Sequence, residues 1–282
     1  MSNFGVKNFI KLRALFKEKG WHNNVEDDYV FESFSHLLNN LTLTEQELIL
    51  DLAERYLWID NGKYIPLLKD LLSEKECVED LASFEKVIFF PVIKPTDQNK
   101  TKSGNLLIYH VKTIKPLLPE PIKNRQFIVL ENFDQISETK FKLGKKDVFV
   151  LIDDFLGTGK TIDATLKKVC ENKYINIDQI RVVGFTALKP SLALLSNWGI
   201  KGYFKNILSK GISEYYTKDV EDKLLVMKKI EKMSMAPKEY KMGFGKSEAL
   251  VTMARTPNNT FSIFWSSHIK DEIEYSAPFP RY

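Results

Sequence analysis

Residues 148–161 read V-F-V-L-I-D-D-F-L-G-T-G-K-T, and this stretch decides the fold. Its apolar half, residues 148–152, has the length and β-branched character of a strand buried on both faces of a parallel sheet. Asp153 and Asp154 follow directly, and a short loop with glycines comes next. A helix is predicted from Lys160 to about Glu171, so the stretch is predicted to run from strand through loop to helix.

Other runs of the same kind extend this unit into a sheet. Ile180–Phe185 follows the predicted helix, and the order strand, helix, strand predicts a βαβ unit with two parallel strands. Val87–Ile93 and Phe127–Leu130 are further candidate strands. Near the C-terminus we expect a charged amphipathic helix over Val220–Met233 and a strand over Phe261–Trp265. The predicted fold class is α/β, a mostly parallel sheet flanked by helices.

The sequence pattern of the first third of the chain predicts helices. Thr44-Glu45-Gln46-Glu47 has the spacing of a capping box, and apolar residues follow it at helical intervals. Further helices are expected over Tyr29–Asn39 and Tyr64–Ser73. We therefore predict a helical N-terminal appendage over residues 1–80 and an α/β domain over residues 81–282.

Composition narrows the classes of function. The chain has 41 basic and 37 acidic residues, a net charge of +4, which is too small an excess to indicate nucleic-acid binding. A small positive net charge is equally compatible with a small anionic ligand. The apolar runs have strand length, and the N-terminus lacks the apolar stretch of a signal peptide, so no membrane association is expected. Cys77 and Cys170 are too far apart for a C-x-x-C motif, and we expect a reducing, cytoplasmic setting.

The residues at the end of the stretch 148–161 are suited to binding a sugar phosphate. Backbone N–H groups of a glycine loop and of a helix N-terminus form an anion cradle suited to a phosphate monoester, and Thr158 and Thr161 can add hydroxyl donors. Asp153 and Asp154 point to opposite sides of a strand, so one can accept hydrogen bonds from a ribose diol while the other faces elsewhere. The alternatives are that Asp154 only caps the following loop and that Lys160 is only a solvated first-turn residue.

A nucleotide-triphosphatase loop is a less favoured interpretation. The motif G-x-x-x-x-G-K would place its first glycine at Asp154, where a carboxylate would confront the phosphates. A second G-K pair at Gly245-Lys246 has Tyr240 in the corresponding position.

The stretch resembles the phosphoribosyl pyrophosphate motif of type I phosphoribosyltransferases, in which four apolar residues, two acidic residues and a short variable segment precede T-G-x-T. The resemblance implies that Asp153 and Asp154 are the catalytic pair that binds the ribose hydroxyls. It assigns the 5-phosphate loop to Phe155, Leu156, Gly157, Thr158, Gly159, Lys160 and Thr161. Purine-salvage members carry a base-contacting Asp where this chain has Gly157, so a 6-oxopurine acceptor is not implied.

The family's chemistry, if retained, is displacement at the anomeric carbon with pyrophosphate as the leaving group. The resemblance implies Mg²⁺ as the cofactor, held mostly by ligand oxygens and water, with Asp153 and Asp154 as the candidate protein ligands. Family members also bind pyrophosphate with a loop after the first strand. The candidates for that loop are Lys94, Lys102, Ser103 and Gly104, although Lys102 fits a solvated loop charge as well.

The C-terminal pattern is similar to that of phosphoribosyltransferase-like proteins of bacterial conflict systems, including retron-linked antiphage modules. It consists of Thr256-Pro257-Asn258-Asn259-Thr260, Phe264-Trp265 and Phe279-Pro280-Arg281. That resemblance implies a defence role alongside partner proteins. Two hypotheses follow. The chain is an enzyme, a glycosyltransferase or nucleotide glycohydrolase acting on a phosphorylated ribose, or it is a non-catalytic sensor of such a ligand that regulates a partner.

Overall fold

The computed structural model describes residues 5–100, 102–270 and 273–281. The chain divides into two compact units, which we describe separately. Residues 61–208 form the sheet unit, and residues 1–60 together with 209–282 form the discontinuous unit. This division differs from the expected boundary near residue 80, because the two helices after residue 60 belong to the sheet unit.

The sheet unit contains a parallel sheet of five strands in the order β3-β2-β4-β5-β6. The strands are β2 (Lys86–Pro91), β3 (Gln126–Val129), β4 (Asp147–Leu156), β5 (Ile180–Leu188) and β6 (Lys201–Leu208). All four neighbouring pairs are parallel. The mostly parallel sheet predicted from the sequence is therefore confirmed, and β6 is a strand that the sequence pattern did not reveal.

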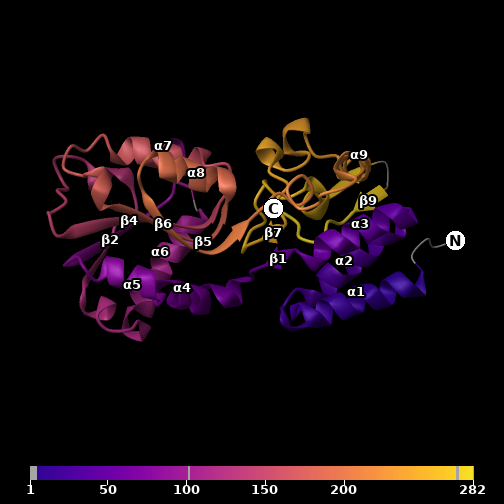
Figure 1. The fold of residues 1–282 in the computed structure, drawn as a ribbon, viewed down its shortest axis with the longest axis horizontal. Coiled ribbons are helices and arrows are strands. Elements are labelled where there is room, and N and C mark those ends of the chain that lie inside the picture. The colour runs from indigo at the N-terminus through magenta and orange to yellow at the C-terminus, as the bar shows by residue number, and fades with distance from the viewer. Residues whose placement is uncertain (1–4, 101, 271–272, 282) are drawn as a thin grey trace. The chain divides into compact units, whose positions relative to one another are not determined.

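Helices cover both faces of this sheet. Figure 1 shows α7 (Lys160–Val169) and α8 (Lys189–Asn197) on one side and α4 (Tyr64–Leu72) and α5 (Lys75–Leu81) on the other. The helix α6 (Ser103–Ile114) packs against α4, β2 and β4. The central strand β4 is buried along nearly its whole length, which explains its continuous apolar run.

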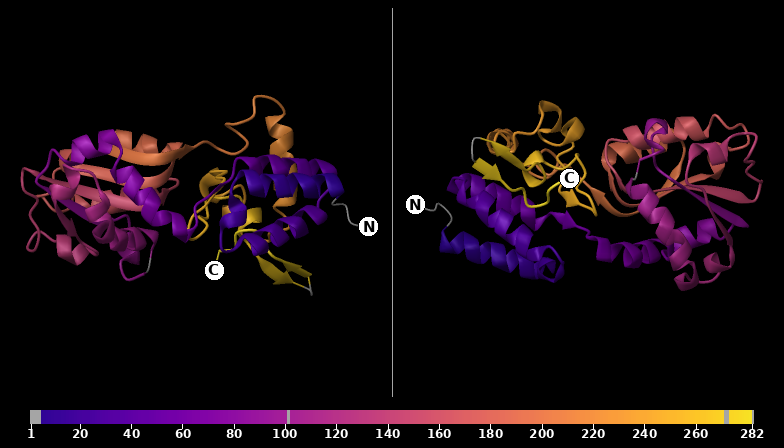
Figure 2. Two further views of the ribbon diagram at one scale, coloured as in Figure 1. Left: turned by 90° about the horizontal axis from the view of Figure 1, so that it is seen from below. Right: turned by 180° about the vertical axis from the view of Figure 1, so that it is seen from behind.

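The discontinuous unit joins the first helices of the chain to its C-terminal part. Its helices α1 (Val6–Glu18), α2 (Asp27–Asn39) and α3 (Leu43–Glu54) lie side by side in Figures 1 and 2, and α9 (Val220–Ile230) contacts α3. This unit also contains two pairs of short strands. Parallel β1 (Leu57–Trp58) pairs with β7 (Val251–Thr252), and antiparallel β8 (His268–Lys270) pairs with β9 (Ile273–Tyr275).

Two local predictions in this unit are corrected. The capping box is formed by Thr42 and Glu45, two residues earlier than the spacing at Thr44 suggested, because α3 begins at Leu43. The strand expected over Phe261–Trp265 is instead a 3₁₀ turn at Ser262–Phe264. Phe261 and Phe264 are both fully buried, so they fill the core of the unit without strand pairing.

Aromatic side chains from both ends of the chain hold this unit together. Tyr56 and Phe279 stack with ring centroids 4.7 Å apart, and Trp21 meets Phe279 edge-on at 5.9 Å. Burying such rings stabilises a core by roughly 1.5–3 kcal/mol each. The apolar faces of the N-terminal helices are therefore covered by residues more than 200 positions later in the sequence.

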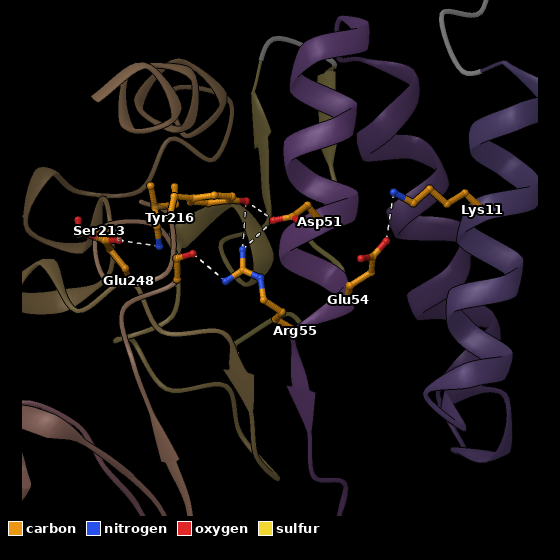
Figure 3. A network of polar contacts seen from close by, with 9 residues as sticks. Lys11, Asp51, Glu54, Arg55, Ser213, Tyr216 and Glu248 are labelled. Atoms are coloured by element: carbon orange, nitrogen blue, oxygen red, sulfur yellow. Dashed lines mark hydrogen bonds and ion pairs between the residues drawn. The ribbon is translucent and has the colours of Figure 1, made fainter. Parts of the chain in front are cut away.

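A polar network anchors the segment after residue 208 to α3 (Figure 3). Arg55 donates one hydrogen bond to the carbonyl oxygen of Gly211 at 2.8 Å and another to Asp51 at 2.8 Å. Tyr216 also donates to Asp51, and the backbone amide of Ser213 donates to Glu248 at 2.8 Å. Burial, followed by the nearby Asp51 carboxylate, raises the pKa of Tyr216, so its hydroxyl stays a donor.

Within residues 5–100, 102–270 and 273–281, no helix combines the length and the apolar composition needed to cross a membrane.

Candidate functional site

The candidate site lies at the carboxyl end of β4, where the structure places the motif as the sequence predicts. Asp153 and Asp154 are near the end of β4, and α7 begins at Lys160. Gly159 precedes α7 as its N-cap, with φ of 84° and ψ of −8°. The carboxyl ends of strands in open α/β sheets are where ligands usually bind, so the position itself is typical of a binding site.

The loop between β4 and α7 combines partial solvent access with one left-handed glycine. Gly157 and Thr158 are half-buried and Lys160 is exposed, so part of the loop faces solvent. Gly159 adopts a left-handed conformation that other residues rarely take. The helix dipole and the backbone amides at the N-terminus of α7 favour a negative charge at this point.

Not all residues of the predicted phosphate loop face the solvent. Phe155 is half-buried, whereas Leu156 is buried in the apolar cluster that also contains Ile162 and Leu166 of α7. Leu156 therefore joins the loop to the core, and the accessible part of the loop begins at Gly157.

The two aspartates are less accessible than diol acceptors were expected to be. Asp153 retains 8% of its exposure and Asp154 retains 4%. Both already accept hydrogen bonds: the hydroxyl of Ser103 donates to Oδ1 of Asp153 at 2.7 Å, and the hydroxyl of Tyr64 donates to Oδ2 of Asp154 at 2.6 Å. A carboxylate has about four acceptor positions, so these bonds do not exhaust either group.

Tyr64 is a residue of this site that sequence analysis missed. It lies 90 positions before Asp154 and appears in the sequence only as the first residue of an amphipathic helix. Its ring is fully buried and packs edge-on against Phe185 of β5 at 5.1 Å. No local sequence pattern predicts this contact, because it depends on how α4 packs on the sheet.

Burial dominates the electrostatics of the pair. Desolvation, followed by the charge of Asp154, raises the pKa of Asp153 well above its usual range, and the hydrogen bond from Ser103 opposes this. Desolvation also raises the pKa of Asp154, against the hydrogen bond from Tyr64. Two adjacent buried carboxylates resist ionising together, and a pair with raised pKa values at a strand end is typical of functional sites.

The candidate pyrophosphate residues lie between β2 and the first turn of α6. Lys102 forms an ion pair with Asp97 at 3.1 Å, and Lys94 is half-buried two residues after Val92. Ser103 begins α6 and contacts the acidic pair instead of a separate loop. The structure thus brings Ser103 to Asp153 at the carboxyl end of β4.

Gly104 has a packing reason to be glycine. An added Cβ would lie 3.0 Å from Cβ of Pro91 and 3.1 Å from the carbonyl oxygen of Ile152. The absence of a side chain lets the start of α6 approach the ends of β2 and β4 closely enough for Ser103 to reach Asp153.

Asp153 and Asp154 are the residues that could contribute to a metal site. Among the described residues, no group of three or more His, Cys, Asp or Glu side chains is arranged to hold a metal ion. Hard carboxylate oxygens suit Mg²⁺, which commonly uses one or two carboxylates together with phosphate oxygens and water. The donor set therefore fits a metal carried mainly by a phosphorylated ligand.

The C-terminal pattern serves the core of the discontinuous unit. Thr256 donates to the carbonyl oxygen of Phe279 at 2.8 Å, and Arg281 donates to the carbonyl oxygen of Thr256 at 2.7 Å. The indole N–H of Trp265 donates to the carbonyl oxygen of Thr260, and the amide of Asn259 donates to Ser247. These bonds account for the pattern by packing and turn geometry within that unit.

Comparison with known proteins places the chain in a family. Residues 19–281 match the sequence model of the family described as PRTase-CE. Comparison with curated protein sequences gave no significant match.

Solved structures with partial similarity include phosphoribosyltransferases. Orotate phosphoribosyltransferase from Aeropyrum pernix is 15% identical, with a TM-score of 0.31 over 58% of this chain and 74% of that one. APRTase from Giardia lamblia, complexed with 9-deazaadenine, is 15% identical, with a TM-score of 0.31 over 52% and 80%. A hypothetical protein from Neisseria gonorrhoeae with bound ppGpp is 9% identical, with a TM-score of 0.34 over 61% and 96%. Scores this low carry no functional argument.

Proposed function

Because this chain belongs to the PRTase-CE family, we propose that it binds the ribose 5-phosphate group of phosphoribosyl pyrophosphate or a related nucleotide. One observation carries the proposal. Asp153 and Asp154 lie near the end of β4, and the chain continues from them through a glycine loop into the N-terminus of α7. A phosphate monoester suits the helix N-terminus and a ribose diol suits the carboxylates. A sugar phosphate contains both groups within one small molecule.

The chemistry we propose is transfer or hydrolysis at the anomeric carbon of that ligand. The loop amides would hold the 5-phosphate, and the acidic pair would fix the ribose, which orients the anomeric carbon. Mg²⁺ bound with the pyrophosphate oxygens would stabilise the charge that develops on the leaving group. In this chain, Asp153 and Asp154 are the residues we propose as its protein contacts.

Calorimetric titration with phosphoribosyl pyrophosphate, with and without Mg²⁺, tests the binding proposal. The double variant Asp153→Asn, Asp154→Asn should weaken binding by at least about tenfold, because a hydrogen bond to a charged acceptor contributes roughly 1.5–3 kcal/mol. Asp147→Asn is the matched control, since Asp147 is a buried aspartate at the opposite end of the same strand. Equal affinities in all three proteins would reject the site.

A non-catalytic sensor is the second candidate, and the ion pair between Lys102 and Asp97 favours it. A lysine engaged by a carboxylate at 3.1 Å is partly neutralised as a pyrophosphate contact. Release of pyrophosphate by the purified chain distinguishes the two functions, since an enzyme produces it on turnover whereas a sensor only binds. Asp97→Asn frees Lys102 and should strengthen binding of inorganic pyrophosphate if that lysine belongs to the site.

We further propose that the chain acts in the cytoplasm of a bacterial cell in defence against phage, together with partner proteins. Support comes from the family match, which runs to residue 281 and so includes the C-terminal pattern that carries the resemblance to conflict-system proteins. The test is the efficiency of phage plating on cells that express the chain with its neighbouring genes. Protection that is lost in the Asp153→Asn, Asp154→Asn variant would support the role, and plating unchanged by the intact genes would refute it.

A further inference from the structure

We infer that the chain forms a homodimer through a groove between α1 and α2, with α1 of each copy lying over α2 of the other. The residues that line this groove all belong to the discontinuous unit, whereas the proposed ribose 5-phosphate site lies in the sheet unit. The dimer is therefore independent of the proposed function, and either can fail without the other.

Helix α1 carries apolar side chains on two faces. One face is buried in the core of the unit and consists of Leu12, Leu15 and Phe16. Val6, Ile10 and Ala14 follow one another at intervals of four residues, so they form a stripe on a different side of the helix. Val6 is 77% exposed and Ile10 is 61% exposed. A surface helix normally has a single apolar stripe, which it buries, so this second stripe indicates a contact with another molecule.

The exposed stripe borders a groove of 710 Å³ between α1 and α2. Phe9 of α1 and Phe31 of α2 line the groove, with their rings edge-on at a centroid distance of 5.6 Å. The two helices lie side by side (Figure 2). A groove of this kind between two helices is a surface into which the apolar face of a further helix packs.

The two helices bring charges of opposite sign to the groove. Arg13 and Lys17, one helical turn apart, form a basic wall on α1, and Asp27 and Asp28 form an acidic wall in the first turn of α2. Within residues 5–100, 102–270 and 273–281, none of these four side chains forms an ion pair. Both walls therefore favour a partner that brings the opposite charge to each of them.

A second copy of the chain supplies both charges in the required arrangement. The turn at Trp21–Asn23 connects α1 to α2, so the basic and the acidic wall lie near the same end of the two helices. A two-fold axis along the groove places α1 of one copy over α2 of the other, and the same contact then occurs twice. Each basic wall meets the acidic wall of the other copy, and the exposed stripe of each α1 is removed from water. A groove with two walls of one sign would instead repel a second copy.

Sedimentation of the full chain over a range of concentrations tests the dimer. The wild-type chain should associate reversibly into dimers. Ile10→Ser should raise the dissociation constant by at least about tenfold, because two apolar side chains leave the contact. Leu225→Ser on α9 is the matched control, since Leu225 is 60% exposed in the same unit and should leave the dissociation constant unchanged.

Two charge-reversal variants test the arrangement of the copies. Arg13→Glu with Lys17→Glu makes both walls acidic, and Asp27→Lys with Asp28→Lys makes both walls basic. Each variant alone should be monomeric, because like charges then meet at both contacts. An equal mixture of the two should form a heterodimer, because an acidic wall then meets a basic wall at each contact.

Lys228→Glu with Lys232→Glu controls for the change in net charge. These two lysines are exposed in the same unit and have the same spacing, so the variant should keep the dimer. A wild-type chain that stays monomeric up to its solubility limit would refute the dimer, and a dimer that Ile10→Ser leaves intact would place the interface elsewhere. A mixture that stays monomeric would exclude the two-fold arrangement. If lysines at the start of α2 lower the melting temperature, Ile10→Ser and its control still decide whether this groove is the interface.

Discussion

Replacing Gly159 by alanine tests whether the phosphate cradle depends on a backbone conformation that only glycine adopts easily. An added Cβ would lie 3.6 Å from atoms of Leu194 and Ser191, which is an ordinary van der Waals contact. The cost is therefore the left-handed conformation at φ of 84°, about 1–2 kcal/mol for a residue with a Cβ. At about 2–4 °C per kcal/mol for a unit of this size, melting should fall by roughly 2–8 °C.

Gly199→Ala is the matched control for this variant. Gly199 also lies in the sheet unit and has φ of 69°, and an added Cβ would meet nothing within 4 Å. The two variants should lose similar stability in thermal unfolding, but only Gly159→Ala should weaken binding of ribose 5-phosphate in calorimetry. Gly159→Asn should recover part of the lost stability, because asparagine tolerates this conformation better than alanine.

Two results would refute this reasoning. A much larger loss of stability in Gly159→Ala than in Gly199→Ala would mean that steric conflict, and not backbone conformation, sets the cost. Unchanged affinity for ribose 5-phosphate in Gly159→Ala would mean that the amides after this residue do not hold the ligand.

Two further predictions concern ionisation in the sheet unit. The raised pKa of Asp153 means that, above about pH 4, the folded chain keeps a proton that the unfolded chain has released. The free energy of unfolding should therefore fall as the pH rises through the folded-state pKa. The slope should be at most about 1.4 kcal/mol per pH unit. Asp153→Asn should remove this slope in urea unfolding at a series of pH values, and an unchanged slope would exclude Asp153 as its source. Asp80 is the opposite case: burial opposes its ionisation, but two hydrogen bonds from the Arg181 guanidinium hold the pKa of Asp80 below the usual range. Arg181→Met should lower the free energy of unfolding by about 2 kcal/mol at neutral pH, and by less at acidic pH, where Asp80 is protonated. An equal loss at both pH values would contradict the pairing of Arg181 with Asp80.

The motif region could be predicted because its signals are local. A buried strand, two strand-end carboxylates and a helix start follow one another within residues 148–161, and each signal concerns neighbours in the chain. The structure confirms this succession, together with the strands β2, β3 and β5 and the helices α2 and α9. Where the local signal was ambiguous it failed: Phe261–Trp265 has the apolar content of a strand but turns in the core of the discontinuous unit.

The remaining features depend on contacts between distant residues. The donors to the acidic pair, Ser103 and Tyr64, lie 50 and 90 positions away from their acceptors, and either would be an ordinary helix-start residue in the sequence. The discontinuous unit could not be predicted from local sequence patterns either, because it depends on contacts such as the stacking of Tyr56 on Phe279.

By itself, then, the sequence determined the strand, the glycine loop and the helix that would bind a phosphate, because hydrophobic periodicity and backbone preference act over a few residues. The tertiary structure alone decided how deeply each aspartate is buried and which helix supplies its hydrogen bond. Desolvation and hydrogen bonding in a core depend on which segments pack together, and that packing is a property of the whole unit.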